Sequence, residues 1–244
     1  FNEGTGSVIH NLAARSHLAQ PLVISDTARV EWMASGLRIV TPTVVTAAAP
    51  VDPHLGTIGD TNEVTVEAWV QPADLERRGR GVIVALAEAA EPAQNVVLAQ
   101  AWEHSSPWPA YNLCVRTTAA PGPCATQLAT PGQHVTPSLT HIVFTRDSLG
   151  RSSLFVDGAR KDHTDVLGDL SNWDAKAQLS LGGLPNGTSP WIGTYRLLAV
   201  YHRALSPAEV RENFLAGPRG DGAIRQLGVQ ADYTFAEGSG AVVR

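Results

Sequence analysis

The sequence has few charges, few lysines and no long apolar run. Only 17% of its 244 residues are charged, and 18 basic against 23 acidic residues leave a net charge of −5. No basic stripe is present, which argues against nucleic acid as a partner. No apolar run approaches the roughly 18 residues of a membrane-spanning helix, so membrane insertion is not expected. Lysine occurs twice against 16 arginines, a bias that we attribute to genomic composition.

Cysteine is also scarce. The two cysteines, Cys114 and Cys124, flank a Pro/Gly turn between two apparent strands. Across such a hairpin their Cα atoms can approach within the ~4.4–6.8 Å that a disulfide requires, so we predict a bridge and an oxidising compartment. Two buried free thiols are the alternative. The His/Cys spacing of a zinc site is absent, which leaves the identity of any bound metal unknown.

Short β-rich runs separated by turn residues make up most of the chain, which has 22 glycines and 16 prolines. In residues 63–70, Val64, Val66 and Val70 alternate with Thr65, Glu67 and Trp69, as in a strand with one buried face. Many short strands with turn signals predict an all-β protein, a two-sheet antiparallel β-sandwich of the jelly-roll kind. Other runs are Leu37–Val40, Gly81–Leu86, Asn95–Gln100, Thr140–Thr145, Ser153–Val156, Ala177–Leu181 and Tyr195–His202.

One short helix is predicted near the C-terminal end. Ser206 is placed as N-cap, Pro207 takes the first helical position and Glu209 completes a capping box. Gly217 then ends the helix, which we expect to cover an edge or an end of the sandwich. We therefore predict one domain over residues 1–217, followed by a linker and an extra strand over residues 218–244.

The two ends of the chain resemble each other. Residues 1–9 match residues 235–243 at five of nine positions, with an offset of 234 residues. The C-terminal copy is the start of a next domain in a tandem array, a strand shared with a neighbouring chain, or a strand in the same sheet. If the strand is shared, its pairing residues are Phe1, Val8, Tyr233, Phe235 and Val242. Because the chain begins at Phe1 without a signal sequence, we expect a mature product or an excised segment.

Six segments carry a resemblance through their order and spacing: Phe1–Gly6, Val64–Pro72, Leu139–Asp147, Leu154–Gly158, Leu179–Gly183 and Trp191–Val210. Together they resemble the laminin-G-like (LamG) jelly rolls of the concanavalin A-like lectin/glucanase superfamily. The resemblance implies a sandwich of two antiparallel sheets in an extracellular, bacterial multidomain protein that binds sugar or protein, in some members with calcium. One departure concerns residues 11–16, where the Asp and the turn glycines common in the family are missing, which puts calcium at this loop in doubt.

The sequence offers little for catalysis. Retaining glycosidases need two carboxyl groups ~5–5.5 Å apart. Glu63 and Glu67 are four residues apart on one expected strand, which separates them by about 13 Å. A Gly-x-Ser-x-Gly nucleophile motif is absent as well. We therefore expect that the protein is not an enzyme. A glycoside-active enzyme is kept as the third alternative, after a binding module and a filament subunit.

Two loops are the candidate ligand sites. The loop over residues 100–111 brings Trp102, His104, Trp108 and Tyr111 close in sequence, and sugars stack on aromatic faces. The alternative is that these side chains pack the loop onto the sandwich. The second loop, residues 184–191, contributes Asn186 and Trp191, although Trp191 also matches a family position that builds the fold.

These observations favour a non-enzymatic extracellular or cell-surface module for adhesion or recognition. Its expected partner is a glycan or a surface protein, within a repeating or multidomain protein. The alternative is a structural subunit of an extracellular filament or array, which binds copies of itself through the C-terminal strand. No cofactor is expected apart from the calcium that the resemblance allows.

Overall fold

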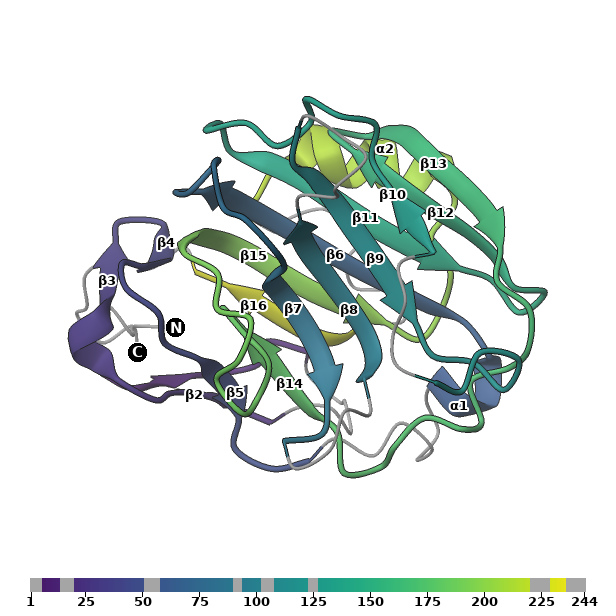
Figure 1. Cartoon of the computed structure of the whole chain (residues 1–244), viewed down its shortest axis with the longest axis horizontal. Helices are drawn as coiled ribbons and strands as arrows, with labels where there is room; N and C mark the ends of the chain where they lie inside the picture. The colour runs from purple at the N-terminus through teal and green to yellow at the C-terminus, as the bar shows by residue number, and fades with distance from the viewer. Residues whose placement is uncertain are drawn as a thin grey trace.

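The computed structural model describes residues 6–13, 20–50, 58–89, 94–101, 108–122, 127–219 and 229–235. They form two antiparallel sheets packed face to face (Figure 1), which confirms the predicted β-sandwich. Sheet A has the order β1 (Val8–Ile9), β2 (Leu22–Ile24), β5 (Val45–Ala47), β14 (Gln178–Leu181), β7 (Gly81–Ala87), β8 (Gln94–Ala101), β9 (Ala110–Val115), β10 (Leu128–Ala129).

Sheet B has the order β13 (Ala159–Asp165), β12 (Arg151–Val156), β11 (Thr140–Arg146), β6 (Val64–Pro72), β15 (Gly193–Tyr201), β4 (Gly36–Ile39), β3 (Val30–Met33). A further strand, β16 (Val229–Thr234), also pairs with β15. The helical elements are η1 (Thr27–Arg29), α1 (Ile58–Thr61) and α2 (Pro207–Ala216).

The alternation predicted for β6 is confirmed. Val64, Val66 and Val70 belong to the core between the two sheets. Trp69 points the other way, into a second cluster on the outer face of sheet B. Because successive side chains of a strand point to opposite faces, one strand supplies both layers.

Helix α2 begins with the predicted capping box. The Ser206 hydroxyl accepts the Glu209 N–H, and the Glu209 carboxylate accepts the Ser206 N–H. The helix packs Val210 and Phe214 into the cluster on the outer face of sheet B. It therefore covers a face of the sandwich, not an edge or an end as the sequence suggested.

Strand β16 corrects the predicted domain boundary after residue 217. It pairs antiparallel with β15 of its own chain, with Tyr233 opposite Leu198, and Tyr233 and Phe235 are buried in the main core. Residues 229–235 are thus part of the same domain, because their apolar side chains complete its core. Val8 lies in sheet A and β16 in sheet B, so these residues do not share a sheet. Phe1 and Val242 lie outside the described residues.

Asn11 ties the N-terminal segment to β16. Its side-chain oxygen accepts the N–H groups of Ala13 and Asp232, both at 2.9 Å, and the Leu12 N–H donates to the Asp232 carbonyl at 2.8 Å. Asn11 thus lies in the loop where members of the family often have an Asp. Its oxygen is engaged by backbone groups of the domain itself.

Candidate functional site

Three loops meet at one end of sheet A. Leu181 at the end of β14 pairs with Val84 of β7, and Gly81 at the start of β7 pairs with Gln100 near the end of β8. Gln100 in turn pairs with Tyr111 at the start of β9. The segments at these strand ends therefore lie side by side, and we call residues 73–80, 108–109 and 182–192 the rim. The two loops predicted from the sequence thus converge, with residues 73–80 between them.

Trp108 is the described aromatic residue of the predicted 100–111 loop that faces solvent. Its side chain is 48% exposed. One side of the indole rests on Gly132, where an added Cβ would come within 3.1 Å of the ring. The exposed indole can stack on a sugar ring. Trp102 and His104 lie outside the described residues, so their roles stay predictions.

Tyr111 and Trp191 are wrong as ligand contacts. Both side chains are buried in the core, 0% and 1% exposed. The Trp191 indole N–H donates to the buried Gln100 Oε1 at 2.9 Å, and burial raises the pKa of the Tyr111 phenol. Each ring points between the sheets, where a large apolar group stabilises the fold most.

Asn186 lies on the rim, exposed, and forms a tight turn. Its side-chain oxygen accepts the Thr188 N–H at 3.1 Å and the Thr188 hydroxyl at 2.6 Å. The residue borders a groove of about 430 Å³. On the other side of the groove, Asp26 and Arg29 form an ion pair at 2.9 Å. The remaining lining residues are Ser25, Pro42, Thr43, Val44, Pro185 and Gly187.

Arginines of the segment before β7 are rim residues that the sequence analysis missed. An Nη atom of Arg80 lies 3.5 Å from Cys114 Sγ, so its side chain extends over the outer face of sheet A from β7 to β9. Burial lowers the pKa of Arg80. Arg77 folds over Gly81. Neither forms an ion pair with a described residue. The basic run in residues 77–80, directly before a strand, was the available signal.

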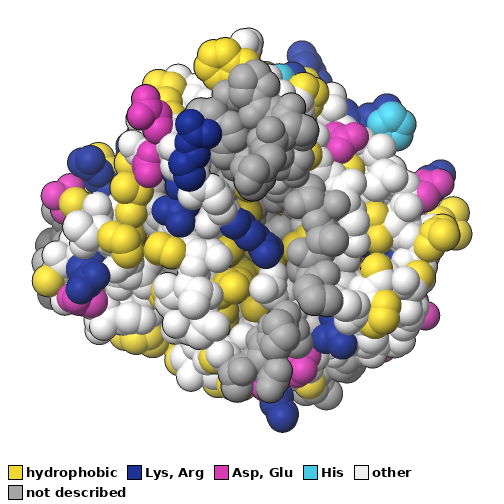
Figure 2. All heavy atoms as spheres, viewed as in Figure 1, with side chains coloured by type: hydrophobic (Ala, Val, Ile, Leu, Met, Phe, Trp, Pro, Cys, Tyr) yellow, Lys and Arg dark blue, Asp and Glu magenta, His cyan; other side chains and the backbone are white. Residues whose placement is uncertain are grey.

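The outer face of sheet A carries small apolar side chains. Val82, Ala85, Val97, Ala99 and Cys114 form one buried cluster there. Figure 2 shows the molecule from the side of Figure 1, on which β7, β8 and β9 lie in front, with Lys and Arg side chains among apolar ones. Cys124 lies outside the described residues, so the disulfide with Cys114 stays a prediction.

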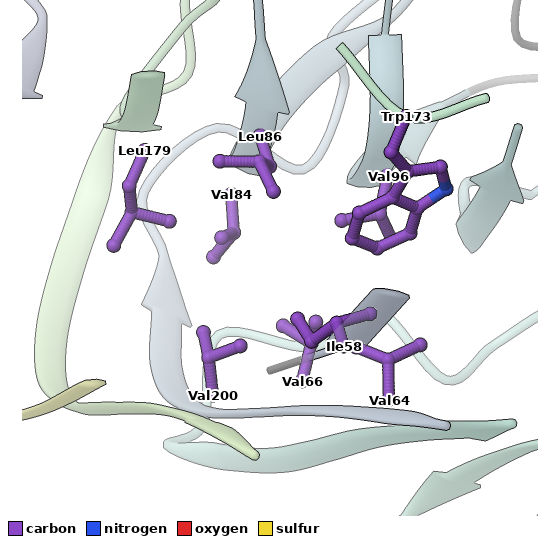
Figure 3. A pocket seen from close by; sticks show the side chains of 9 residues that line it. All are labelled: Ile58, Val64, Val66, Val84, Leu86, Val96, Trp173, Leu179 and Val200. Carbon is purple, nitrogen blue, oxygen red and sulfur yellow. The ribbon is translucent and has the colours of Figure 1, made fainter. Parts of the chain in front are cut away.

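A small cavity lies between the two sheets (Figure 3). Its volume is about 20 Å³, close to that of one water-sized probe, and apolar side chains from both sheets point into it. With no polar group in its lining, it is a packing defect of the core. Its lining residues are Ile58, Val64, Val66, Val84, Leu86, Val96, Trp173, Leu179 and Val200.

Metal-ligating groups do not cluster in the part of the chain that the structure describes. Among those residues, no three His, Cys, Asp or Glu side chains come together in a way that could hold a metal ion. None of the described helices is long and apolar enough to cross a membrane.

A family model described as the concanavalin A-like lectin/glucanases superfamily (Laminin_G_3) matches residues 45–211, more than half of the chain. A search of curated proteins finds no match. Among solved structures, Trypanosoma rangeli sialidase in complex with sialic acid is 18% identical with a TM-score of 0.59, over 88% of this chain and 32% of that chain.

Two smaller solved structures are also similar. The CBM40 of the Ruminococcus gnavus IT-sialidase is 16% identical with a TM-score of 0.54, over 72% of this chain and 95% of that chain. Domain 4 of AbnA, an extracellular arabinanase from Geobacillus stearothermophilus, was solved in complex with arabinotriose. It is 15% identical with a TM-score of 0.52, over 84% of this chain and 85% of that chain. At these identities the likeness shows the fold alone.

Proposed function

The chain belongs to the concanavalin A-like lectin/glucanase superfamily, and from that premise we propose that it is a non-enzymatic module that binds carbohydrate through its rim. Two structural neighbours are solved with saccharides, one with α2,3-sialyllactose and one with arabinotriose. These neighbours support the class of ligand. They say nothing of which sugar this chain binds.

The single observation that carries the proposal is that Trp108 and Arg80 both lie next to strand ends at the same end of sheet A, where Trp108 is exposed and from where Arg80 reaches over the outer face to Cys114. An indole offers a flat apolar surface for the C–H face of a sugar ring, and a guanidinium donates hydrogen bonds to oxygen atoms at its edge. Asn186 borders the adjoining groove. The rim therefore provides both kinds of group that sugar recognition uses.

The carboxylates near the rim support binding over hydrolysis. Glycosidases aim two carboxyl groups at one bond. In the described part of the rim and its adjoining groove, Asp26 is in an ion pair with Arg29. Asp74 accepts the Glu76 N–H at 3.0 Å, as in a turn. Glu67 is fully buried under α2, on the outer face of the other sheet.

As the biological role we propose adhesion or recognition within an extracellular, bacterial surface protein of several domains. The alternative of a filament subunit that shares its C-terminal strand loses support for residues 229–235, because β16 pairs with β15 of its own chain. Calcium dependence, which the family allows, is tested by repeating the binding assay with a chelator.

The test is a titration of the whole chain with α2,3-sialyllactose, arabinotriose and a panel of neutral oligosaccharides. We expect Trp108→Ala and Arg80→Gln each to weaken the saccharide that binds by about tenfold or more, with folding retained. The matched controls are Leu167→Ala, which removes another exposed apolar side chain, and Arg211→Gln on α2. No binding by the wild-type chain, or equal losses in the controls, would contradict the proposal.

A further inference from the structure

A second groove lies on the outer face of sheet B. It has a volume of about 530 Å³, within the range of ligand sites, and it opens where β11 and β12 meet the entry to α2. Strand β6 runs from Val64 beside this groove to Pro72 beside the rim, a span of roughly 26 Å. The second groove is therefore separate from the rim. We call it the α2 groove.

Hydrogen bonds hold both walls of the α2 groove. On one wall, the Ala204 N–H donates to Glu63 Oε2 at 3.0 Å, which fixes the chain before α2. On the other wall, Asp147 accepts the Leu149 N–H at 3.0 Å and the Arg151 Nε at 2.6 Å. A ligand would meet preorganised walls, which lowers the entropy lost on binding.

The floor of the α2 groove presents hydroxyl groups that the protein does not use. Thr145 of β11 and Ser153 of β12 are direct cross-strand partners and both line the groove. Thr145 is 6% exposed. Neither hydroxyl has a hydrogen-bond partner among the described residues, although the neighbouring Ser152 and Thr65 hydroxyls both do. Ser153 is partly exposed and the Thr145 hydroxyl oxygen is not sealed from solvent, so both hydroxyls can form hydrogen bonds with a ligand or with water.

Two charges mark the ends of the α2 groove. Arg160 of β13 lines it beside Phe155, and within the described residues it has no ion-pair partner. Glu63 lines the other end, and it too forms no ion pair with a described residue. Strand rise and spacing separate the Cα atoms of Glu63 and Arg160 by roughly 20 Å. The arrangement suits an elongated ligand with hydroxyls along its length and an anionic group at one end.

A sugar fits this lining better than a peptide. The floor is the face of a sheet whose backbone groups are already paired, so a peptide could not add to it as a strand. Phe155 is buried, which leaves no deep apolar pocket for a peptide anchor. Hydroxyls, a carboxylate and a planar guanidinium are the groups that bind sugar hydroxyls and a sugar carboxylate.

We infer that the α2 groove is a second saccharide site, selective for a short oligosaccharide that carries a carboxylate, with Arg160 pairing with the carboxylate. Glu63, Thr145 and Ser153 bind the sugar hydroxyls. This inference rests on the proposed carbohydrate-binding function and adds a site on the opposite face, so one module could hold two glycan chains at once.

The test is an NMR titration of the full chain with trigalacturonate and, separately, with neutral galactotriose. We expect trigalacturonate to shift the backbone amide signals of Thr145, Ser153 and Arg160. Arg160→Gln should weaken this binding about tenfold or more, because a charge-assisted pair is lost. Thr145→Val, which keeps the shape of the buried side chain, should weaken it by less. Galactotriose should bind the groove at least tenfold more weakly than trigalacturonate.

Two further variants separate the outcomes. Lys161→Gln makes the same charge change on the next residue of β13, outside the groove, and should leave binding unchanged. Trp108→Ala should leave the groove shifts intact. If saccharides move only rim signals, or if Lys161→Gln weakens binding as much as Arg160→Gln, the groove inference is wrong and the proposed function stands. If the groove signals move and no saccharide moves rim signals, the rim proposal is wrong. If neither region responds, both are wrong.

Discussion

The outer faces of the two sheets differ in the side chains and elements that cover them. On sheet A, small apolar side chains such as Ala85 and Ala99 lie beside a rim with an extended, half-buried Arg80. On sheet B, a buried carboxylate, Glu67, lies beneath helix α2. Helix α2 thus closes the part of the outer face of sheet B that lies over Glu67, whereas within the described residues the outer face of sheet A carries no helix and borders the exposed rim.

Polar and aromatic contacts close the face of sheet B. Glu67 accepts hydrogen bonds from the Tyr201 hydroxyl at 2.8 Å and the Asn213 amide at 2.9 Å, and lies 3.0 Å from His141 Nε2. The Trp69 ring stacks on His141 at a centroid distance of 4.8 Å. Since Asn213 belongs to α2, the carboxylate ties the helix to the sheet. Because this carboxylate binds groups from β11, β15 and α2, it favours one arrangement of these elements.

The largest effect is expected from removing β16. A chain that ends at residue 223 lacks Tyr233 and Phe235, which are both buried in the core, and leaves an edge of β15 without its partner. We expect this chain to lose cooperative folding, because two large core side chains together stabilise by several kcal/mol. A chain that ends after Phe235 keeps every described contact and is the control. Wild-type thermal stability in the short chain would contradict the one-domain assignment.

Glu67→Ala should have the next largest effect. It leaves the buried donors of Tyr201 and Asn213 without their acceptor, which predicts a loss of about 3–5 kcal/mol in the free energy of unfolding. Urea denaturation measures it, and Glu212→Ala on the exposed side of α2 is the control. A loss below about 1 kcal/mol in the free energy of unfolding would contradict the view that Glu67 holds α2 on the outer face of sheet B.

Reduction of the predicted Cys114–Cys124 bridge should destabilise the domain less. The enclosed loop is short, so the chain-entropy model gives a loss of at most about 3 kcal/mol. Unfolding curves with and without a reductant measure the difference. Saccharide binding at the rim should weaken as well, because Arg80 lies against Cys114. Two free thiols in the mass spectrum of the native protein would reject the bridge.

The smallest effect concerns the capping box of α2. Burial raises the pKa of Glu209, but the hydrogen bonds from Ser206 and Arg203 outweigh it and leave the pKa below its usual 4.5. A lowered folded-state pKa stabilises the protein above the unfolded pKa, and this stability is lost as the pH falls through the folded pKa. Glu209→Gln should therefore cost under about 1 kcal/mol at pH 7 and less at pH 3. An equal cost at both pH values would contradict this origin.

Much of the fold could be predicted because its signals are local. The alternation in β6 and the capping box at Ser206 each depend on residues within a few positions of one another. The residues of the candidate site were harder to predict from the sequence. Trp108 and Asn186 were found on the rim, whereas Tyr111 and Trp191 turned out to be core residues, since nothing in an aromatic side chain's own sequence neighbourhood tells whether it faces inward.

The sequence by itself determined the two-sheet sandwich, the strand periods and the start of α2, because propensity, capping and alternation act over short distances along the chain. Only the tertiary structure decided that β16 completes its own domain, that Arg80 reaches over to β9, and that α2 covers sheet B. These depend on which segments pair and pack across large sequence separations. That choice is set by the total apolar area buried and the hydrogen bonds satisfied in the whole fold.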